Sequence, residues 1–144
     1  KDFSMSKIAV VYWSGTGNTE AMADAVLKGA KDKGAEVDIF TAADFSADKM
    51  GDYDAVAFGC PSMGVEELED SEFQPMFESC EAALSGKKIA LFGSYGWGDG
   101  EWMRNWEERC ISDGAVMACD CLTVNEAPDD NALLSCNDLG AALV

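Results

Sequence analysis

The chain has 144 residues, of which 48% are hydrophobic, and its 27 acidic against 10 basic side chains give a formal net charge of −17. This length suits a single domain, 1–144, with a buried core of ordinary size. So acidic a surface repels nucleic acid and anionic membranes, and it attracts basic protein faces with a strong dependence on salt. The chain contains no histidine, which excludes Cys–His and Ser–His nucleophile pairs and removes the commonest transition-metal ligand.

The six cysteines do not have the spacings of zinc or iron–sulfur sites, so no metal centre is expected. Cys119 and Cys121 lie two apart on an expected strand, which predicts that both point to the same face. We see no secretory leader and no apolar run long enough to span a membrane. These features predict free thiols in a reducing cytoplasm.

Strands and helices alternate along the chain. The expected strands cover residues 7–12, 36–41, 55–59, 88–93 and 115–124. The expected helices cover 18–33, 72–84, 101–111 and the segment after Pro128, with a short helical turn at 46–50. In the last helix, four leucines are expected to face inward: Leu133, Leu134, Leu139 and Leu143. This alternation predicts an α/β fold, a doubly wound five-stranded parallel sheet with helices on both faces.

In such a sheet, ligands bind beyond the carboxyl ends of the strands. Three unusual loops are expected there: 13–19, 60–70 and 94–100. The glycines, hydroxyls and amides of the first loop run directly into a helix, and with the helix N-terminus they form a cradle for an anion. The loop lacks the lysine of nucleoside-triphosphate loops, and Glu20 stands where a dinucleotide fingerprint needs its third glycine. A single terminal phosphate fits, but a plain turn with Asn18 or Thr19 as helix N-cap fits equally well.

The third loop, 94–100, places Trp97 between two glycines. Flanking glycines leave the backbone amides free to donate to a ligand, and the indole offers a flat stacking surface. The alternative is that Trp97 packs over the helix expected at 101–111, beside Trp102 and Trp106. Because an anion cradle is expected at the same edge of the sheet, the two loops together favour a phosphorylated planar ligand.

Three motifs are similar to those of the flavodoxin family, in its short-chain form from anaerobic bacteria: Tyr12-Trp13-Ser14-Gly15-Thr16-Gly17-Asn18-Thr19-Glu20, Gly59-Cys60-Pro61-Ser62-Met63-Gly64 and Phe92-Gly93-Ser94-Tyr95-Gly96-Trp97-Gly98-Asp99-Gly100. The resemblance covers nearly the whole chain and implies the strand order 2-1-3-4-5. It implies non-covalently bound FMN in a monomeric, low-potential one-electron carrier. Such a carrier substitutes for ferredoxin by cycling between oxidised, neutral semiquinone and hydroquinone states.

The resemblance also implies roles for particular residues. The phosphate group would be held by the side chains of Ser14, Thr16, Asn18 and Thr19 and the amides of Gly15 and Gly17. Met63 and Trp97 would sandwich the flavin ring, and Glu66 would accept from its N3–H. The ring and ribityl surroundings would be completed by Pro61, Ser62, Gly64, Val65, Ser94, Tyr95, the backbone of Gly96 and Gly98, Asn125 and Glu126.

Two residues depart from the family pattern. Pro61 replaces a common serine, so neither a hydroxyl nor an N–H is available there, and Ser62 is expected to compensate. Val65 occupies a turn whose peptide to Gly64 is expected to flip when the flavin is reduced. Because a β-branched residue resists positive φ, we expect Val65 to leave positive φ to Gly64. The turn Met63-Gly64-Val65-Glu66 would then favour either the form in which the Gly64 carbonyl faces the flavin or a third conformer.

The partners implied are basic faces of redox proteins such as ferredoxin-dependent oxidoreductases and hydrogenase-type enzymes. Carboxylates near the flavin are expected to make its fully reduced anion costly and so lower the potential of the second electron. The alternative function is an FMN-dependent NAD(P)H quinone or nitro reductase on the same fold. A cofactor-free signalling domain lacks its phospho-acceptor, because the strand 55–59 leads to Cys60 and not to Asp.

Overall fold

The computed structural model describes residues 5–144. The sheet contains the strands β1 (Lys7–Tyr12), β2 (Glu36–Thr41), β3 (Ala55–Gly59), β4 (Lys88–Tyr95), β5 (Val116–Met117) and β6 (Leu122–Asn125). The α-helices are α1 (Asn18–Asp32), α2 (Phe73–Cys80), α3 (Glu101–Ser112) and α4 (Asp130–Ala142). Short 3₁₀ helices cover Ala42–Asp44, Ala47–Asp52 and Glu81–Ala83.

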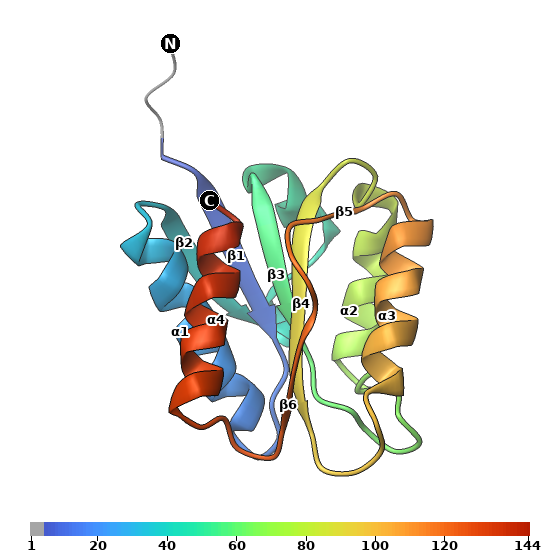
Figure 1. The fold of residues 1–144 in the computed structure, drawn as a ribbon. Coiled ribbons are helices and arrows are strands. Elements are labelled where there is room, and N and C mark those ends of the chain that lie inside the picture. The colour runs from blue at the N-terminus through green and yellow to red at the C-terminus, as the bar shows by residue number, and fades with distance from the viewer. Residues whose placement is uncertain (1–4) are drawn as a thin grey trace.

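The strands are parallel and follow the order β2-β1-β3-β4-β5, with β6 also paired to β4. This confirms the doubly wound α/β fold and its strand order. Helices α1 and α4 cover one face of the sheet, and α2 and α3 cover the other (Figure 1). Since all strands run the same way, their carboxyl ends and the loops that follow β1, β3 and β4 gather at one edge, at the bottom of Figure 1.

The fifth strand differs from the prediction of one continuous strand over 115–124. Two short segments, β5 and β6, both pair with β4, and residues 118–121 between them bend away from regular pairing. The expectation for the two cysteines was therefore wrong. Cys119 packs against the core on the face of the sheet that α1 and α4 cover. Cys121 packs against the core on the opposite face, which α2 and α3 cover. Strict alternation of side chains applies only to an unbroken strand.

Two helices also differ from their predicted form. The helix expected over 72–84 is α-helical only to Cys80 and continues as a 3₁₀ turn. In α4, Leu139 and Leu143 are buried as expected, but Leu134 is 61% exposed. At the contact between α4 and α1, glycines let the two backbones touch: a Cβ on Gly140 would lie 2.0 Å from the carbonyl oxygen of Val26. This close approach fixes which face of α4 is buried.

Candidate cofactor site

A cavity of about 320 Å³ opens at the carboxyl edge of the sheet, between the three loops. It is lined by Trp13, Gly15, Thr16, Asn18, Pro61, Ser62, Met63, Ser94, Tyr95, Gly96 and Glu126. All of these except Trp13 are among the residues expected at the site. The parallel strands bring the loops together because each loop follows the carboxyl end of a neighbouring strand.

The side-chain hydroxyl of Ser14 stabilises the conformation of the loop after β1. The Oγ of Ser14 accepts hydrogen bonds from the backbone N–H groups of Gly17 at 3.1 Å and Glu20 at 3.2 Å. Ser14 therefore shapes the loop from inside and is absent from the cavity wall. Helix α1 begins after Gly17, whose φ of 98° is left-handed. Gly17 is thus the N-cap residue, so the expectation of Asn18 or Thr19 at that position is wrong.

Thr19 lies in the first turn of α1 and is only 1% exposed. Its Oγ1 has no hydrogen-bond partner among residues 5–144. A buried hydroxyl without a partner costs about 1–3 kcal/mol. The first-turn N–H groups of α1 also have no acceptor within the helix. Ser14 Oγ accepts the N–H of Glu20, so the helix end combines the unused hydroxyl with the remaining first-turn amides and the positive end of the helix dipole, which suits the phosphate of FMN.

The loop after β3 forms a tight hairpin. Met63 and Glu67 pair as an isolated antiparallel bridge, with N–H···O distances of 2.8 Å in both directions. The turn thus spans Gly64, Val65 and Glu66 between the paired residues. Gly64 has a φ of 54° and Glu66 a φ of 55°, while Val65 avoids positive φ. Positive φ therefore falls on Gly64 and not on Val65, as expected, and the direction of the Gly64 carbonyl stays a prediction.

Glu66 faces the third loop from this hairpin. One carboxylate oxygen accepts the N–H of Glu101 at 2.8 Å, and a Cβ on Gly98 would lie 2.7 Å from the Glu66 carboxyl carbon. Glu66 therefore caps α3, which begins after the left-handed Gly100 with no side-chain cap of its own. The same carboxylate is the group expected to accept from flavin N3–H, but Glu66 does not line the cavity and lines a neighbouring hollow on the α2/α3 side.

The loop after β4 brings the remaining residues to the mouth. Trp97 is 64% exposed while Trp102 and Trp106 are each 2% exposed, so the alternative in which its indole packs beside these two is wrong. Glu126 lines the cavity with its carboxylate beside Gly96, and its backbone N–H donates to Tyr95 O at 2.8 Å. Asn125 donates to the same carbonyl through its side chain at 3.3 Å.

Ten of the expected residues line the cavity, and nine do not: Ser14, Gly17, Thr19, Gly64, Val65, Glu66, Trp97, Gly98 and Asn125. Sequence reasoning missed Trp13. Its indole packs on Gly15, and its Nε1–H donates to the carboxylate of Glu72 at 2.9 Å. An aromatic residue directly before the small-residue loop was the signal that could have indicated it.

The site holds no activated nucleophile. Cys60, behind the cavity wall, is fully buried, and burial raises the pKa of its thiol far above the ordinary value. Among residues 5–144, no group of three or more His, Cys, Asp or Glu side chains is placed to hold a metal ion. None of the helices in the described part of the chain is long and apolar enough to cross a membrane.

The fold and the site thus define a nucleotide-binding α/β domain with a phosphate cradle and a cleft rimmed by flat and apolar side chains. Comparison with known proteins specifies it further: the model of the flavodoxin family matches residues 10–139. The flavodoxin of Clostridium beijerinckii is 48% identical over 121 residues, 84% of this chain and 88% of that protein. The flavodoxin of Megasphaera elsdenii is 46% identical over 135 residues, 94% of this chain and 96% of that protein.

A solved structure of two-electron reduced Megasphaera elsdenii flavodoxin covers 94% of this chain and 97% of its own with a TM-score of 0.85. A flavodoxin from the domain Archaea has a TM-score of 0.86 at 30% identity, with 95% of each chain covered. The chain belongs to the flavodoxin family. It is an FMN-binding electron carrier and not an enzyme.

Proposed function

We propose that the chain is a low-potential one-electron carrier that substitutes for ferredoxin, with FMN held between the three loops. FMN supplies the redox chemistry, since its ring accepts electrons one at a time. The phosphate is assigned to the loop after β1, where Gly15, Thr16 and Asn18 line the cavity and Thr19 offers its unpaired hydroxyl. Ser14 and the backbone of Gly17 keep that loop in shape.

The ring is assigned to the space between the hairpin 63–67 and the loop after β4. Met63 is 38% exposed and Trp97 is 64% exposed at its two sides, and both offer surface for contact with a flat ring. Glu66 and the backbone of Gly96 and Gly98 are assigned to its polar edge. The ribityl side is assigned to Ser62, Ser94, Tyr95, Asn125 and Glu126, most of which line the cavity.

The proposed partners are basic faces of ferredoxin-dependent oxidoreductases and hydrogenase-type enzymes. The net charge of −17 supports this assignment because it accelerates association with basic surfaces. We place the protein in the cytoplasm, as a monomer. All six cysteines are free, as they would be in a reducing compartment.

The unpaired hydroxyl of Thr19 carries the phosphate assignment and offers its test. Replacing Thr19→Val keeps the shape of the side chain and removes the hydroxyl. We expect the FMN-free protein to gain about 1 kcal/mol of unfolding free energy, because a buried group without a partner is lost. FMN affinity should fall about tenfold, the equivalent of one hydrogen bond to a charged phosphate.

Urea unfolding of the FMN-free protein and fluorescence titration with FMN measure the two quantities separately. Thr16→Val tests the exposed neighbour in the same loop: it should weaken FMN binding without stabilising the FMN-free protein. A Thr19→Val protein that binds FMN as tightly as the native one would overturn this assignment of the phosphate.

A further inference from the structure

Trp13 borders two hollows at once. One of them is the cofactor cavity. The other has a volume of about 260 Å³ and lies between the loop after β1, the end of β2 and the start of α2, and its wall includes Trp13, Glu20 and Glu72. An indole ring that borders open space in two directions is not fixed by packing alone. The position of the Trp13 ring therefore depends on specific contacts.

Two contacts set the position of this ring. The Nε1–H of Trp13 donates to Oε1 of Glu72 at 2.9 Å. On the cavity side, a Cβ on Gly15 would lie 3.1 Å from Cη2 of the indole, so the ring lies directly against the backbone of the loop after β1. The hydrogen bond to Glu72 thus connects that loop to the start of α2, which is 59 residues away in the sequence.

The backbone that carries the Glu72 carboxylate is itself well fixed. Glu72 is the N-cap residue of α2, and its N–H donates to Oε1 of Glu69 at 2.9 Å. Glu69 is buried and also accepts the amides of Ser71 and Phe73, each at 2.8 Å. The carboxylate of Glu72 therefore extends from an anchored residue. A hydrogen bond to a charged acceptor is also stronger than one between neutral groups.

A carboxylate is an unexpected neighbour for a phosphate site. Glu72 and Glu20 both line the second hollow, beside the loop to which the phosphate is assigned. Two negative groups repel each other, so the charge of Glu72 by itself weakens the binding of a phosphate. If charge were its only effect, removing Glu72 would strengthen FMN binding. Its hydrogen bond to Trp13 predicts the opposite.

We propose that Glu72 is a positioning residue for the cofactor phosphate, because it fixes the loop after β1 through the indole of Trp13. This inference rests on the proposed function, since it takes the phosphate to lie in that loop. Ser14 shapes the loop from inside, and Glu72 fixes it from outside. A loop that is held in place before FMN arrives loses less conformational entropy when the phosphate binds.

The proposal is tested by fluorescence titration of the FMN-free protein with FMN and with riboflavin, which lacks the phosphate. Glu72→Ala removes the acceptor, and Trp13→Phe removes the donor but keeps an aromatic ring beside Gly15. We expect each variant to bind FMN about fivefold more weakly and riboflavin less than twofold more weakly. The double variant should lose no more than either single variant, because both remove the same hydrogen bond.

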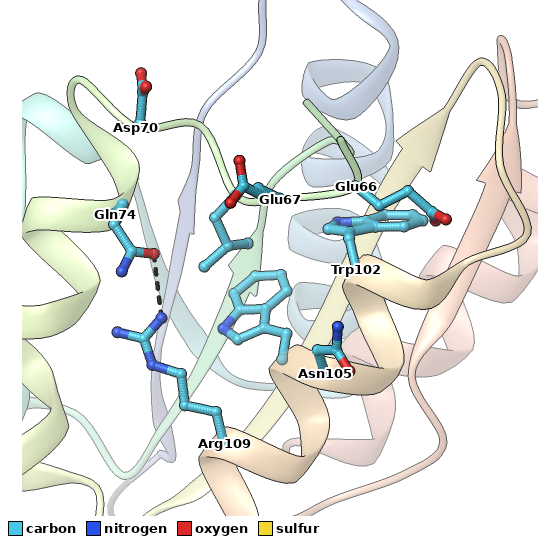
Figure 2. Close-up of a pocket in the computed structure, with 9 residues that line it drawn as sticks. Glu66, Glu67, Asp70, Gln74, Trp102, Asn105 and Arg109 are labelled. Carbon is cyan, nitrogen blue, oxygen red and sulfur yellow. Dashed lines mark hydrogen bonds between the residues drawn. The ribbon is translucent and has the colours of Figure 1, made fainter. Parts of the chain in front are cut away.

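Tighter FMN binding by Glu72→Ala, or equal losses for FMN and riboflavin, would overturn the proposal. Glu72→Gln separates charge from hydrogen bonding, since it keeps an acceptor oxygen, and it should lose about twofold in FMN affinity. The matched control is Glu67→Gln, which removes the same charge from an exposed position on the neighbouring loop, where Figure 2 shows Glu67 at the hollow between this loop and α3. This control should bind FMN at least as tightly as the native protein.

Hydrogen exchange in the FMN-free protein measures the conformation of the loop directly. The N–H groups of Gly17 and Glu20 are bonded to Ser14 Oγ, so their exchange rates report how often the loop opens. We expect these two amides to exchange about fivefold faster in Glu72→Ala, while the amides of β1 keep their native rates. Unchanged rates at Gly17 and Glu20 would overturn the proposal.

A failure of the proposed function gives a different result. If the native protein binds riboflavin as tightly as FMN, the assignment of the phosphate to the loop after β1 fails whatever the variants do. If the native protein prefers FMN, the variants decide on the role of Glu72 alone.

Discussion

Two glutamates beside the cofactor cavity, Glu66 and Glu126, have left-handed backbones with φ of 55° and 63°. Such residues cost about 1–2 kcal/mol each and concentrate at functional sites. Glu66 is held by its bond to Glu101 N–H, and Glu126 by its own N–H bonded to Tyr95 O. The strained residues therefore lie where the hairpin is bonded to the start of α3 and where the end of β6 is bonded to the end of β4.

Val65 sets the conformation of the hairpin beside them. Val65→Gly should make positive φ at position 65 accessible, so the form with the Gly64 carbonyl turned away from the flavin becomes more populated. We expect the potential of the first electron to fall by about 40 mV, the equivalent of about 1 kcal/mol of backbone preference. Anaerobic potentiometry measures it, with Val65→Ala as the control that keeps a Cβ. An unchanged or raised potential in Val65→Gly would contradict this role.

Glu69 is a second carboxylate with a structural task. It is 4% exposed and accepts hydrogen bonds from the Ser71 hydroxyl and from the amides of Ser71, Glu72 and Phe73 at the start of α2. Burial by itself raises the pKa of Glu69, but these hydrogen bonds together outweigh burial and lower it. Glu69 therefore stabilises the start of α2 and does not face the flavin.

Glu69→Gln should lower the unfolding free energy at pH 7 by about 1–2 kcal/mol. Because the pKa is lower in the folded state, the stabilisation is complete above the unfolded value of about 4.3 and disappears as the pH falls through the folded value. Urea unfolding curves of native and variant protein should therefore converge in acid. The exposed neighbour Glu67 serves as the control, since Glu67→Gln should change stability by less than about 0.5 kcal/mol.

Glycines allow α1 and α4 to pack with their backbones in contact. A Cβ on Gly29 would lie 1.9 Å from the carbonyl oxygen of Asn137, which is far inside van der Waals contact. The Asn137 side chain in turn donates to Ala25 O at 2.7 Å. The two backbones are thus in contact at Gly29, and the helices cannot separate without breaking the hydrogen bond from the Asn137 side chain to Ala25 O.

Gly29→Ala and Gly140→Ala should each lower the unfolding free energy by about 2–4 kcal/mol, because the helices must separate to admit a methyl group. Gly51→Ala is the matched control, since a Cβ there meets nothing within 4 Å. Its stability should stay within about 0.5 kcal/mol of the native value or rise slightly. Thermal unfolding of the FMN-free proteins measures all three. Equal stabilities would show that the helix contact adapts to the added methyl.

At the scale of the whole molecule, the net charge of −17 acts on the flavin as well as on partners. A negative surface makes it costly to add a negative charge to a bound group, and added salt screens this repulsion. Glu126 contributes most directly among the carboxylates, because it lines the cofactor cavity. Asp99, by contrast, is paired with Arg104 at 3.0 Å.

Glu126→Gln should raise the potential of the second electron by about 20–60 mV, and raising the ionic strength should raise it in the native protein as well. Anaerobic redox titration at low and high salt measures both effects. Glu36→Gln removes the same charge at the opposite edge of the sheet and should have a smaller effect. If both substitutions change the potential equally, the local role of Glu126 is wrong and only total charge matters.

The sequence by itself determined the α/β class, the positions of most strands and helices and the three loops at one edge of the sheet. It did so because hydrophobic periodicity, glycine and the alternation of strand and helix are local properties. The resemblance of the three loop motifs to flavodoxins predicted FMN as the cofactor. The match to the flavodoxin family and its members confirmed this prediction. Positive φ at Gly64 was also predictable, since it follows from the intrinsic preference of Val65.

Only the tertiary structure decided the features that depend on contacts between residues far apart in the sequence. The broken fifth strand arises from pairing with β4, and the exposure of Leu134 follows from the glycine contact between α1 and α4. The inward turn of Ser14, the unpaired hydroxyl of Thr19 and the capping of α3 by Glu66 follow from loop packing. No local pattern encodes these contacts, because each depends on which surfaces meet when the sheet and its helices come together.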